Sequence, residues 1–259
     1  MTYNEAYNQS INNKESFWRE QAQEIDWLKF PEKILSQNEK GFYSWYEGGQ
    51  LNTSYLALDY HVENGRENQT AIIYDSPVTN TKEHITYQQL LNRVAKFAGV
   101  LKNLGVEKGN RVVIYMPMIP QTVVAMLACA RIGAVHSVVF GGFAAHELAI
   151  RIDDATPKVI LTASGGKEIN RIVPYKPIID AAIEEATHKV KSVVVYQRDF
   201  VKAEMQKGRD FDWNNALINA SPAGYVALEA TDPLYILYTS GTTGKPKGIV
   251  RDNGGHAVA

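Results

Sequence analysis

The feature that most constrains the fold is an alternation, from about residue 83 onward, of amphipathic helical segments with short, continuous apolar runs. Such runs are typical of strands that are buried on both faces and joined by helical crossovers. The sequence therefore predicts an α/β fold with a mainly parallel sheet flanked by helices. The expected strands cover residues 111–116, 135–140, 158–162, 192–196, 234–237 and 248–251, and the expected helices cover residues 87–104, 120–133, 144–154 and 177–187.

The helix boundaries carry their own signals. Thr86 followed by Gln89 is a capping box, in which each side chain accepts a hydrogen bond from the backbone N–H of the other residue. Gly105 is a typical residue just after the end of a helix and would terminate the helix that Thr86 starts. Pro120 is favoured at the first position of the next helix. These signals agree with the periodicity of the apolar residues between them.

Residues 1–62 differ in composition from the rest of the chain. They contain no long apolar strand and are rich in polar and aromatic residues, so we expect an extended segment that packs its aromatic side chains onto a larger body formed by residues 63–259. The aromatic residues concerned are Phe17, Trp18, Trp27, Phe30, Phe42, Tyr43, Trp45 and Tyr46.

Charge and composition exclude several classes of protein. Lysine and arginine number 27 against 28 aspartates and glutamates, a formal net charge of −1, so the chain offers no strong field for nucleic acid or an anionic membrane. A hydrophobic fraction of 45% with 21% charged residues is typical of a globular chain. The only cysteine, Cys129, excludes an internal disulfide and suits a reducing compartment, and its apolar helix predicts a core thiol.

No segment reads as a signal or a membrane span. Residues 1–17 are polar and lack the apolar core of a secretion signal and the arginine-rich pattern of a transit peptide, which favours a cytoplasmic location. The longest apolar region, residues 122–143, contains Arg131 and His136 and is interrupted by glycines. A charge at the centre of a membrane-spanning helix is costly, so we interpret this region as a buried helix followed by a buried strand.

The first candidate site is the run Tyr-Thr-Ser-Gly-Thr-Thr-Gly-Lys-Pro-Lys-Gly at residues 238–248. Glycines allow the backbone to approach a ligand closely, and hydroxyl, backbone N–H and ammonium groups on one loop are the donors that a polyphosphate needs. A solvated turn between two strands is the alternative. The run is no Walker A motif, because Pro246 stands where that motif needs its second glycine, five residues after Gly241. The candidate phosphate-binding residues are Thr239, Ser240, Gly241, Thr242, Thr243, Gly244, Lys245 and Lys247.

This run resembles the phosphate-binding signature of the acyl-adenylate-forming superfamily, and residues 45–52, 138–143 and 151–154 resemble further segments of its short-chain acyl-CoA synthetases. The resemblance covers essentially the whole chain. It implies the N-terminal part of the adenylate-forming fold, with an acyl-CoA synthetase N-terminal segment at residues 1–62 and part of an AMP-binding domain at 63–259. It also implies ATP, coenzyme A and Mg²⁺ as cofactors.

The second candidate site follows the strand expected at residues 158–162. By composition it is a loop with surface cations, in which Lys167 and Arg171 could bind a phosphate. The resemblance implies that Glu168, Ile169, Asn170 and Arg171 bind the nucleotide end of coenzyme A. Glu168 stands where acetyl-CoA synthetases have arginine, and Arg251 stands where they have histidine, so the resemblance favours propionate over acetate as the carboxylate substrate.

The resemblance also limits what this chain does by itself. Family members continue much further, and the adenine contacts, the carboxylate pocket, the acidic metal ligand and the adenylation lysine are expected there. We therefore expect a fragment with no complete catalytic set, no metal ligands, no ligase activity alone, and open sheet edges that favour aggregation. Two alternatives stay open: a non-catalytic nucleotide-binding module, and an adenylation domain that loads a carrier protein. The oligomeric state is not indicated.

Other titratable residues suggest structural roles. His136 lies in an apolar strand and is interpreted as a core histidine with its hydrogen bonds satisfied. Asp153 and Asp154 lie near a helix end, where a capping or solvated role is expected. The remaining histidines show no metal-ligand spacing.

Overall fold

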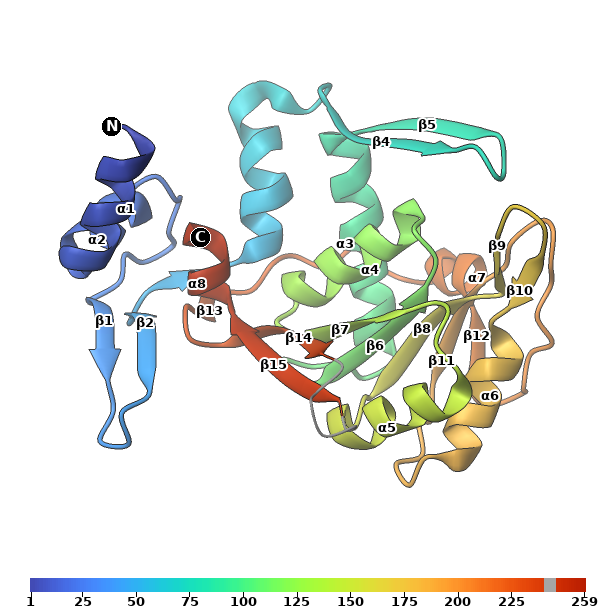
Figure 1. The fold of residues 1–259 in the computed structure, drawn as a ribbon. Helices are drawn as coiled ribbons and strands as arrows, with labels where there is room; N and C mark the ends of the chain where they lie inside the picture. The colour runs from blue at the N-terminus through green and yellow to red at the C-terminus, as the bar shows by residue number, and fades with distance from the viewer. Residues whose placement is uncertain (240–245) are drawn as a thin grey trace.

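The computed structural model describes residues 1–239 and 246–259, and a seven-stranded sheet forms its centre (Figure 1). The strand order is β12-β11-β8-β6-β7-β14-β15, and every neighbouring pair is parallel except β14 and β15. The mainly parallel α/β sheet expected from the sequence is therefore confirmed. Its strands are β6 (Arg111–Met116), β7 (Val135–Phe140), β8 (Val159–Ala163), β11 (Val193–Tyr196), β12 (Asp210–Asp212), β14 (Pro233–Thr239) and β15 (Lys247–Asp252).

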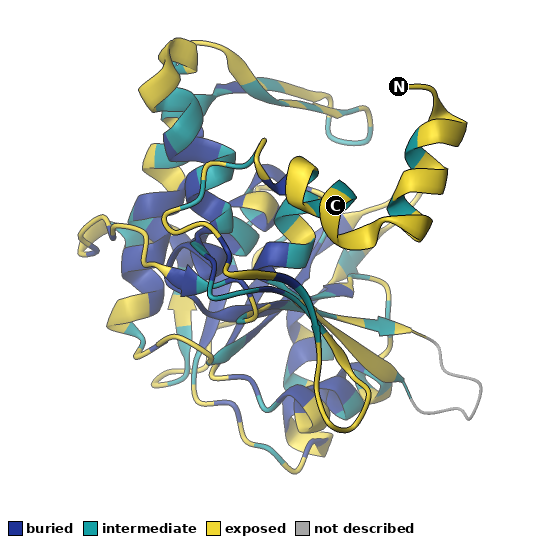
Figure 2. Ribbon diagram, turned by 90° about the vertical axis from the view of Figure 1, so that its left-hand side faces the viewer, coloured by how far each residue is buried: buried dark blue, intermediate teal, exposed yellow. Residues whose placement is uncertain are grey.

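Helices cover both faces of this sheet because successive residues of each strand point to opposite sides. Val112 and Ile114 of β6 pack in the core beneath α3 and α4, whereas Val113 and Tyr115 pack against α5 and α6. Figure 2 shows the buried residues gathered on the central strands and the inner faces of these helices. The first face carries α3 (Tyr87–Asn103), α4 (Pro120–Arg131) and α7 (Trp213–Ile218), and the second carries α5 (Ala145–Ala155) and α6 (Lys176–Glu185).

The order of the strands creates a topological switch point at β6, where successive connections go to opposite sides of that strand. From β6 the chain passes through α4 to β7 on one side, and then through α5 to β8 on the other side of β6. The carboxyl ends of β6, β7, β8, β11 and β14 all lie at one edge of the sheet, because these strands are parallel. Ligands of such sheets bind at this edge.

The N-terminal segment is folded rather than extended, so that expectation was wrong. It forms helices α1 (Tyr3–Asn12) and α2 (Lys14–Ala22) and a hairpin of β1 (Lys33–Gln37) and β2 (Tyr43–Glu47). Thr2 and Glu5 form a capping box that starts α1, a signal the sequence analysis overlooked. The aromatic packing that the sequence predicted is present, since Trp18, Trp27, Trp45 and Tyr46 contact one another around Ala22, Ile34, Leu51 and Ala230.

The N-terminal segment contacts the main body through residues near the C-terminus. Strand β3 (Gln50–Leu51) pairs with β13 (Leu228–Glu229), and the hairpin lies beside the C-terminal helix α8 (Asn253–Val258) (Figure 1). Two π-helical turns follow, η1 (Tyr55–Asp59) and η2 (Val62–Arg66). Asp59 forms a buried, two-bond ion pair with Arg131 of α4 at 2.7 and 3.0 Å. Buried pairs of this kind are sensitive to the loss of either partner.

Two short hairpins were not expected from the sequence. One is formed by β4 (Thr70–Ser76) and β5 (Thr81–Thr86), and the other by β9 (Gly165–Lys167) and β10 (Ile172–Pro174). The second hairpin replaces the simple strand-to-helix loop expected at residues 163–171. Exposed, half-buried and buried positions are mixed along their strands, unlike the continuously buried runs of the central strands.

The core residues agree with the sequence analysis except at His136. Cys129 is buried, and burial raises the pKa of its thiol. His136 is also buried, but its Nδ1 has no hydrogen-bond partner among residues 1–239 and 246–259, so the satisfied histidine expected from the sequence is not found. Within the same two stretches, no helix combines the length and the apolar character needed to cross a membrane.

Candidate functional site

The first candidate loop is closed by an antiparallel pair of strands. Strand β14 ends at Thr239 and β15 begins at Lys247, and these two residues are register partners across the pair. Both are exposed, so a hydroxyl and an ammonium group face solvent at the base of the loop. The other six candidate phosphate ligands, Ser240, Gly241, Thr242, Thr243, Gly244 and Lys245, lie outside the described residues.

The loop leaves the sheet at the edge where a ligand is expected. Strand β14 runs parallel to β7, so Thr239 stands at the same carboxyl edge as the ends of β7, β6 and β8. The sheet thus brings the two candidate loops to one edge. They are three strand positions apart, since β8 carries the second loop and β6 and β7 intervene, which is about 14 Å.

The second candidate segment forms the tip of the β9–β10 hairpin. Glu168, Asn170 and Arg171 are exposed there, and the side chain of Ile169 is 86% exposed. Arg171 donates two hydrogen bonds to the carboxylate of Glu168, from Nε at 2.7 Å and from Nη2 at 3.1 Å. This contact lowers the pKa of Glu168 and raises that of Arg171. The arginine that the sequence analysis assigned to a phosphate therefore already has a carboxylate partner.

Tyr175 connects this hairpin to the end of β7, a role that sequence reasoning missed. A Cβ atom added to Gly141 would lie 2.7 Å from the Tyr175 hydroxyl oxygen, and one added to Gly166 would lie 2.5 Å from it. Only glycine at these two positions leaves room for the tyrosine. Glycines after β7 and after β8 were the available signal, although their shared partner could not be read from the sequence.

One cavity of about 360 Å³ lies at the carboxyl edge next to the hairpin. It is lined by Lys167 of β9, by Tyr196 at the end of β11 and by Arg198 just after it. Pro120 and Gln121 at the start of α4 also line it. Asp199 and Glu83 also reach it, so its charges are mixed. From the second candidate loop, Lys167 lines this cavity.

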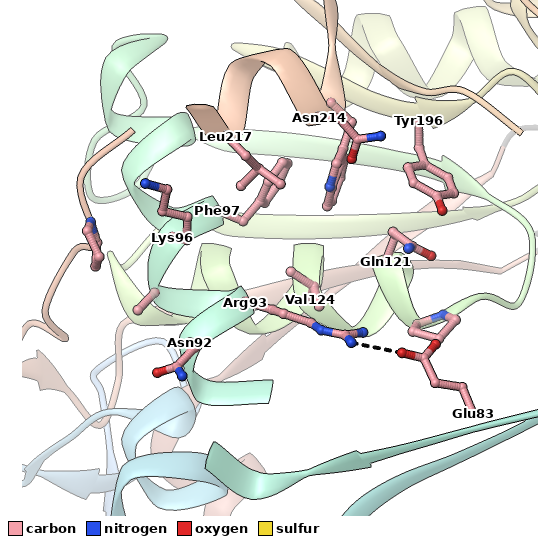
Figure 3. Close-up of a pocket in the computed structure, with 14 residues that line it drawn as sticks. Glu83, Asn92, Arg93, Lys96, Phe97, Gln121, Val124, Tyr196, Asn214 and Leu217 are labelled. Carbon is pink, nitrogen blue, oxygen red and sulfur yellow. Dashed lines mark hydrogen bonds and ion pairs between the residues drawn. The ribbon is translucent and has the colours of Figure 1, made fainter. Parts of the chain in front are cut away.

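A cavity of about 710 Å³ lies between α3, α4 and α7 (Figure 3). Phe97 and Trp213 stack in its wall with ring centroids 3.7 Å apart, and Arg93 pairs with Glu83 at 2.8 Å. None of the candidate residues within the described stretches lines this cavity. We attribute the cavity to the packing of the helices and not to the candidate site.

The described side chains offer no ready metal centre. In the two stretches that the structure describes, no three histidine, cysteine, aspartate or glutamate side chains are grouped as a metal site. The donor set of the first loop, hydroxyls with lysines, fits phosphate oxygens instead.

An α/β sheet with a hydroxyl- and lysine-rich loop at its carboxyl edge defines a class of nucleotide-binding proteins. Residues 59–258 match the family model described as AMP-binding enzyme, and residues 3–57 match the one described as acetyl-coenzyme A synthetase N-terminus. The chain belongs to the AMP-binding enzyme family.

Several relatives match almost the whole chain. An uncharacterized protein of Pseudomonas aeruginosa is 56% identical over 259 residues, which are 100% of this chain and 41% of that protein. A mitochondrial acyl-CoA synthetase short-chain family member 3 of Rattus norvegicus is 50% identical, over 96% of this chain and 37% of its own length. An acetyl-coenzyme A synthetase of Pyrobaculum aerophilum is 43% identical, over 99% and 40%.

A solved structure shows the same fold. The acetoacetyl-CoA synthetase from Streptomyces lividans superposes with a TM-score of 0.88 and 27% identity, over 100% of this chain and 39% of that one. The chain thus spans about two fifths of the length of the relatives it matches.

Proposed function

We propose that the chain forms part of an AMP-forming short-chain acyl-CoA synthetase. In the first step, a carboxylate oxygen attacks the α-phosphorus of ATP, and the bond to the β-phosphate breaks to release pyrophosphate. In the second step, the sulfur of coenzyme A attacks the acyl carbon, the bond to AMP breaks, and the thiol proton is released. The carboxylate needs no activation as a nucleophile, so the protein has mainly to align the reactants and stabilise phosphate charge.

The observation that carries this proposal is the position of the signature at residues 238–248. It bridges β14 and β15 at the carboxyl edge of the sheet, in a chain whose residues 59–258 match the AMP-binding enzyme family. We assign Thr239 and Lys247, with the six candidate residues between them, to the β- and γ-phosphates of ATP. Mg²⁺ would share that charge, with ligands that we expect outside this chain.

We propose that the hairpin tip formed by Glu168, Ile169, Asn170 and Arg171 contacts coenzyme A, with Arg171 as the residue that binds a phosphate. Their exposed position at a hairpin tip suits a contact with the charged nucleotide end of coenzyme A. A phosphate that binds Arg171 would have to compete with the carboxylate of Glu168. We also propose a division at residues 62 and 63 between an N-terminal segment and the AMP-binding part, and propionate in preference to acetate. The preference rests on Glu168 and Arg251 alone.

The test uses a swapped protein, in which residues 1–259 of this chain replace the matching part of the Pseudomonas aeruginosa relative. We expect it to catalyse ATP–pyrophosphate exchange only when propionate or acetate is present, and to release AMP only when coenzyme A is added. The 259-residue chain alone should show neither activity. The unaltered relative, assayed in parallel, controls for the host protein.

Other outcomes would favour the alternatives. ATP binding by the 259-residue chain that is indifferent to carboxylates, together with an inactive swapped protein, would indicate a non-catalytic nucleotide-binding module. Exchange without coenzyme A-dependent AMP release, but with acyl transfer to a carrier protein, would indicate a carrier-loading adenylation domain. Because the carboxylate pocket is expected in the host part, the preference is tested by Glu168→Arg and Arg251→His in the swapped protein: an unchanged ratio of kcat/KM for propionate and acetate would contradict it.

A further inference from the structure

Tyr238 closes the base of the candidate phosphate loop. It is the next-to-last residue of β14 and the register partner of Gly248 in β15, and the following pair is Thr239 with Lys247. We call these four residues the stem. Because the two strands are paired, we expect a shift of Tyr238 to move Thr239 and Lys247 as well.

A residue far away in the sequence holds the Tyr238 side chain. The hydroxyl of Tyr238 donates a hydrogen bond of 2.6 Å to Oδ2 of Asp154, 84 positions earlier in the chain and in the last turn of α5. Burial and then this hydrogen bond raise the pKa of the Tyr238 phenol, so the hydroxyl remains a neutral donor at neutral pH. Helix α5 is thereby tied to the stem.

Arg151 approaches the same ring from the same helix. Its guanidinium carbon lies 5.6 Å from the centre of the Tyr238 ring and 4.7 Å from that of Phe143. The Arg151 side chain is only 4% exposed and pairs with Glu147 at 2.8 Å, so its position is fixed. Residues three apart on a helix share a face, which is why Arg151 and Asp154 meet one tyrosine together.

The ring also lies close to the backbone of β15. A Cβ atom added to Gly248 would lie 3.1 Å from Cε1 of Tyr238 and 3.5 Å from Oδ2 of Asp154. That separation from Cε1 is tighter than ordinary van der Waals contact, so even an alanine would press on the ring. The glycine at the end of the signature lets the tyrosine and the aspartate meet.

The place of Asp154 on its helix argues that this contact is specific. The last turn of α5 contains two aspartates and no basic residue, and the helix dipole disfavours carboxylates there. Each aspartate has a partner that offsets this cost: Asp153 accepts the backbone N–H of His188 at 2.8 Å, and Asp154 accepts Tyr238. A residue that was merely solvated would have no such partner.

We propose that Asp154, supported by Arg151, is a positioning residue for the phosphate loop: it fixes Tyr238 and so the stem before a triphosphate binds. This inference rests on the proposed function of the loop. Donors that are already in place when a ligand arrives avoid the cost of ordering them, so the effect should fall on ATP and not on the carboxylate.

The kinetic test uses the swapped protein and ATP–pyrophosphate exchange with propionate. Asp154→Ala and Tyr238→Phe should each raise the KM for ATP about fivefold, the factor that one hydrogen bond typically supplies, and leave the KM for propionate unchanged. Asp154→Asn keeps an oxygen acceptor and should stay within about twofold of wild type, and the double variant should be no worse than the worse single one. Tyr235→Phe, on the same strand, is the matched control.

Hydrogen–deuterium exchange on the 259-residue chain provides the second measurement. Peptides that cover residues 236–250 should exchange faster in Asp154→Ala and Tyr238→Phe than in wild type, Asp154→Asn or Tyr235→Phe. Unchanged exchange, or equal effects on the KM for ATP and for propionate, would overturn the proposal. An inactive swapped protein would contradict the proposed function, while the exchange measurement would still decide whether Asp154 fixes the stem.

Discussion

At residue 168 a glutamate neutralises the arginine to which we assign a phosphate contact. The pair is exposed, and exposed pairs are weak and screened by salt. A phosphate can therefore displace the carboxylate, but it has to compete with it. Glu168 would thus reduce the affinity for coenzyme A without preventing binding.

Glu168→Gln should lower the KM of the swapped protein for coenzyme A by about two- to threefold, with a larger effect at low ionic strength. The physical reason is the release of the Arg171 guanidinium from a charged partner. AMP release at varied coenzyme A concentration measures it. Glu39→Gln removes the same charge from the turn of the β1–β2 hairpin and should change nothing. A KM that rises in Glu168→Gln would show that Glu168 itself contributes to binding.

His136 gives the fold a dependence on acid. Burial, followed by the charge of His256, lowers the pKa of His136 from 6.5 to about 4. A base with a depressed pKa in the folded state contributes stability that is complete above its unfolded pKa and is lost as the pH falls from 6.5 toward 4.

We therefore expect wild type to lose about 2 kcal/mol more of its free energy of unfolding between pH 7 and pH 4.5 than His136→Leu loses. Urea titrations of both chains at the two pH values measure the difference. His84→Leu, at a more exposed position on β5, should keep the wild-type dependence. Equal losses in wild type and His136→Leu would show that other groups dominate acid unfolding.

Among the elements, helix α3 makes an unusually close contact. A Cβ atom on Gly99 would overlap the backbone carbonyl of Ser221, and the neighbouring Ala223 donates its N–H to the carbonyl of Ala95 at 2.9 Å. The helix thus packs against the backbone of the segment that follows α7. Glycine costs helix stability at an interior position, so we attribute its presence here to the space that it leaves for Ser221.

Gly99→Ala should lower the free energy of unfolding by about 1–3 kcal/mol, even though alanine is the better helix former, because the backbone of the 220–223 segment must move. Gly224→Ala is the matched control, since a Cβ atom there meets nothing within 4 Å. Thermal or urea unfolding of the two variants measures the contrast. Stabilisation of both variants would contradict the packing argument.

The elements also show what sequence reasoning can and cannot reach. Strand β6, helix α4 and strand β7 were predicted because their apolar runs are continuous and Pro120 marks a boundary. The hairpin β9–β10 was missed because its three-residue strands contain two glycines and a lysine. Both candidate loops were proposed from their residues, and their binding roles stay a prediction. The Asp154–Tyr238 contact joins positions 84 apart, which no local pattern reveals.

At the scale of the molecule, the sheet ends at β15 with an apolar face. Ile249 and Leu237 are each 48% exposed and are register partners on neighbouring strands, so they form one apolar strip. The described part of the chain places no further strand beyond β15. Edges of this kind pair with other chains.

The 259-residue chain should therefore self-associate as its concentration rises, and Ile249→Lys should shift this association to higher concentration. A charge on an edge strand opposes pairing with another chain. Sedimentation velocity over a range of concentrations measures it. Ile218→Lys, which removes an exposed apolar side chain from α7, should behave like wild type. A wild-type chain that stays monomeric throughout would contradict the prediction.

The small core around Tyr46 has a consequence for how the protein is made. Its early residues are completed by Ala230, and Gln50 and Thr53 bond to partners 179 and 200 positions later. During synthesis, the first fifty residues thus leave the ribosome long before the residues that pack against them. Chain closure over such separations is slow, so the central sheet should nucleate folding while this opening stretch waits, exposed to proteases and chaperones, until synthesis has passed residue 253.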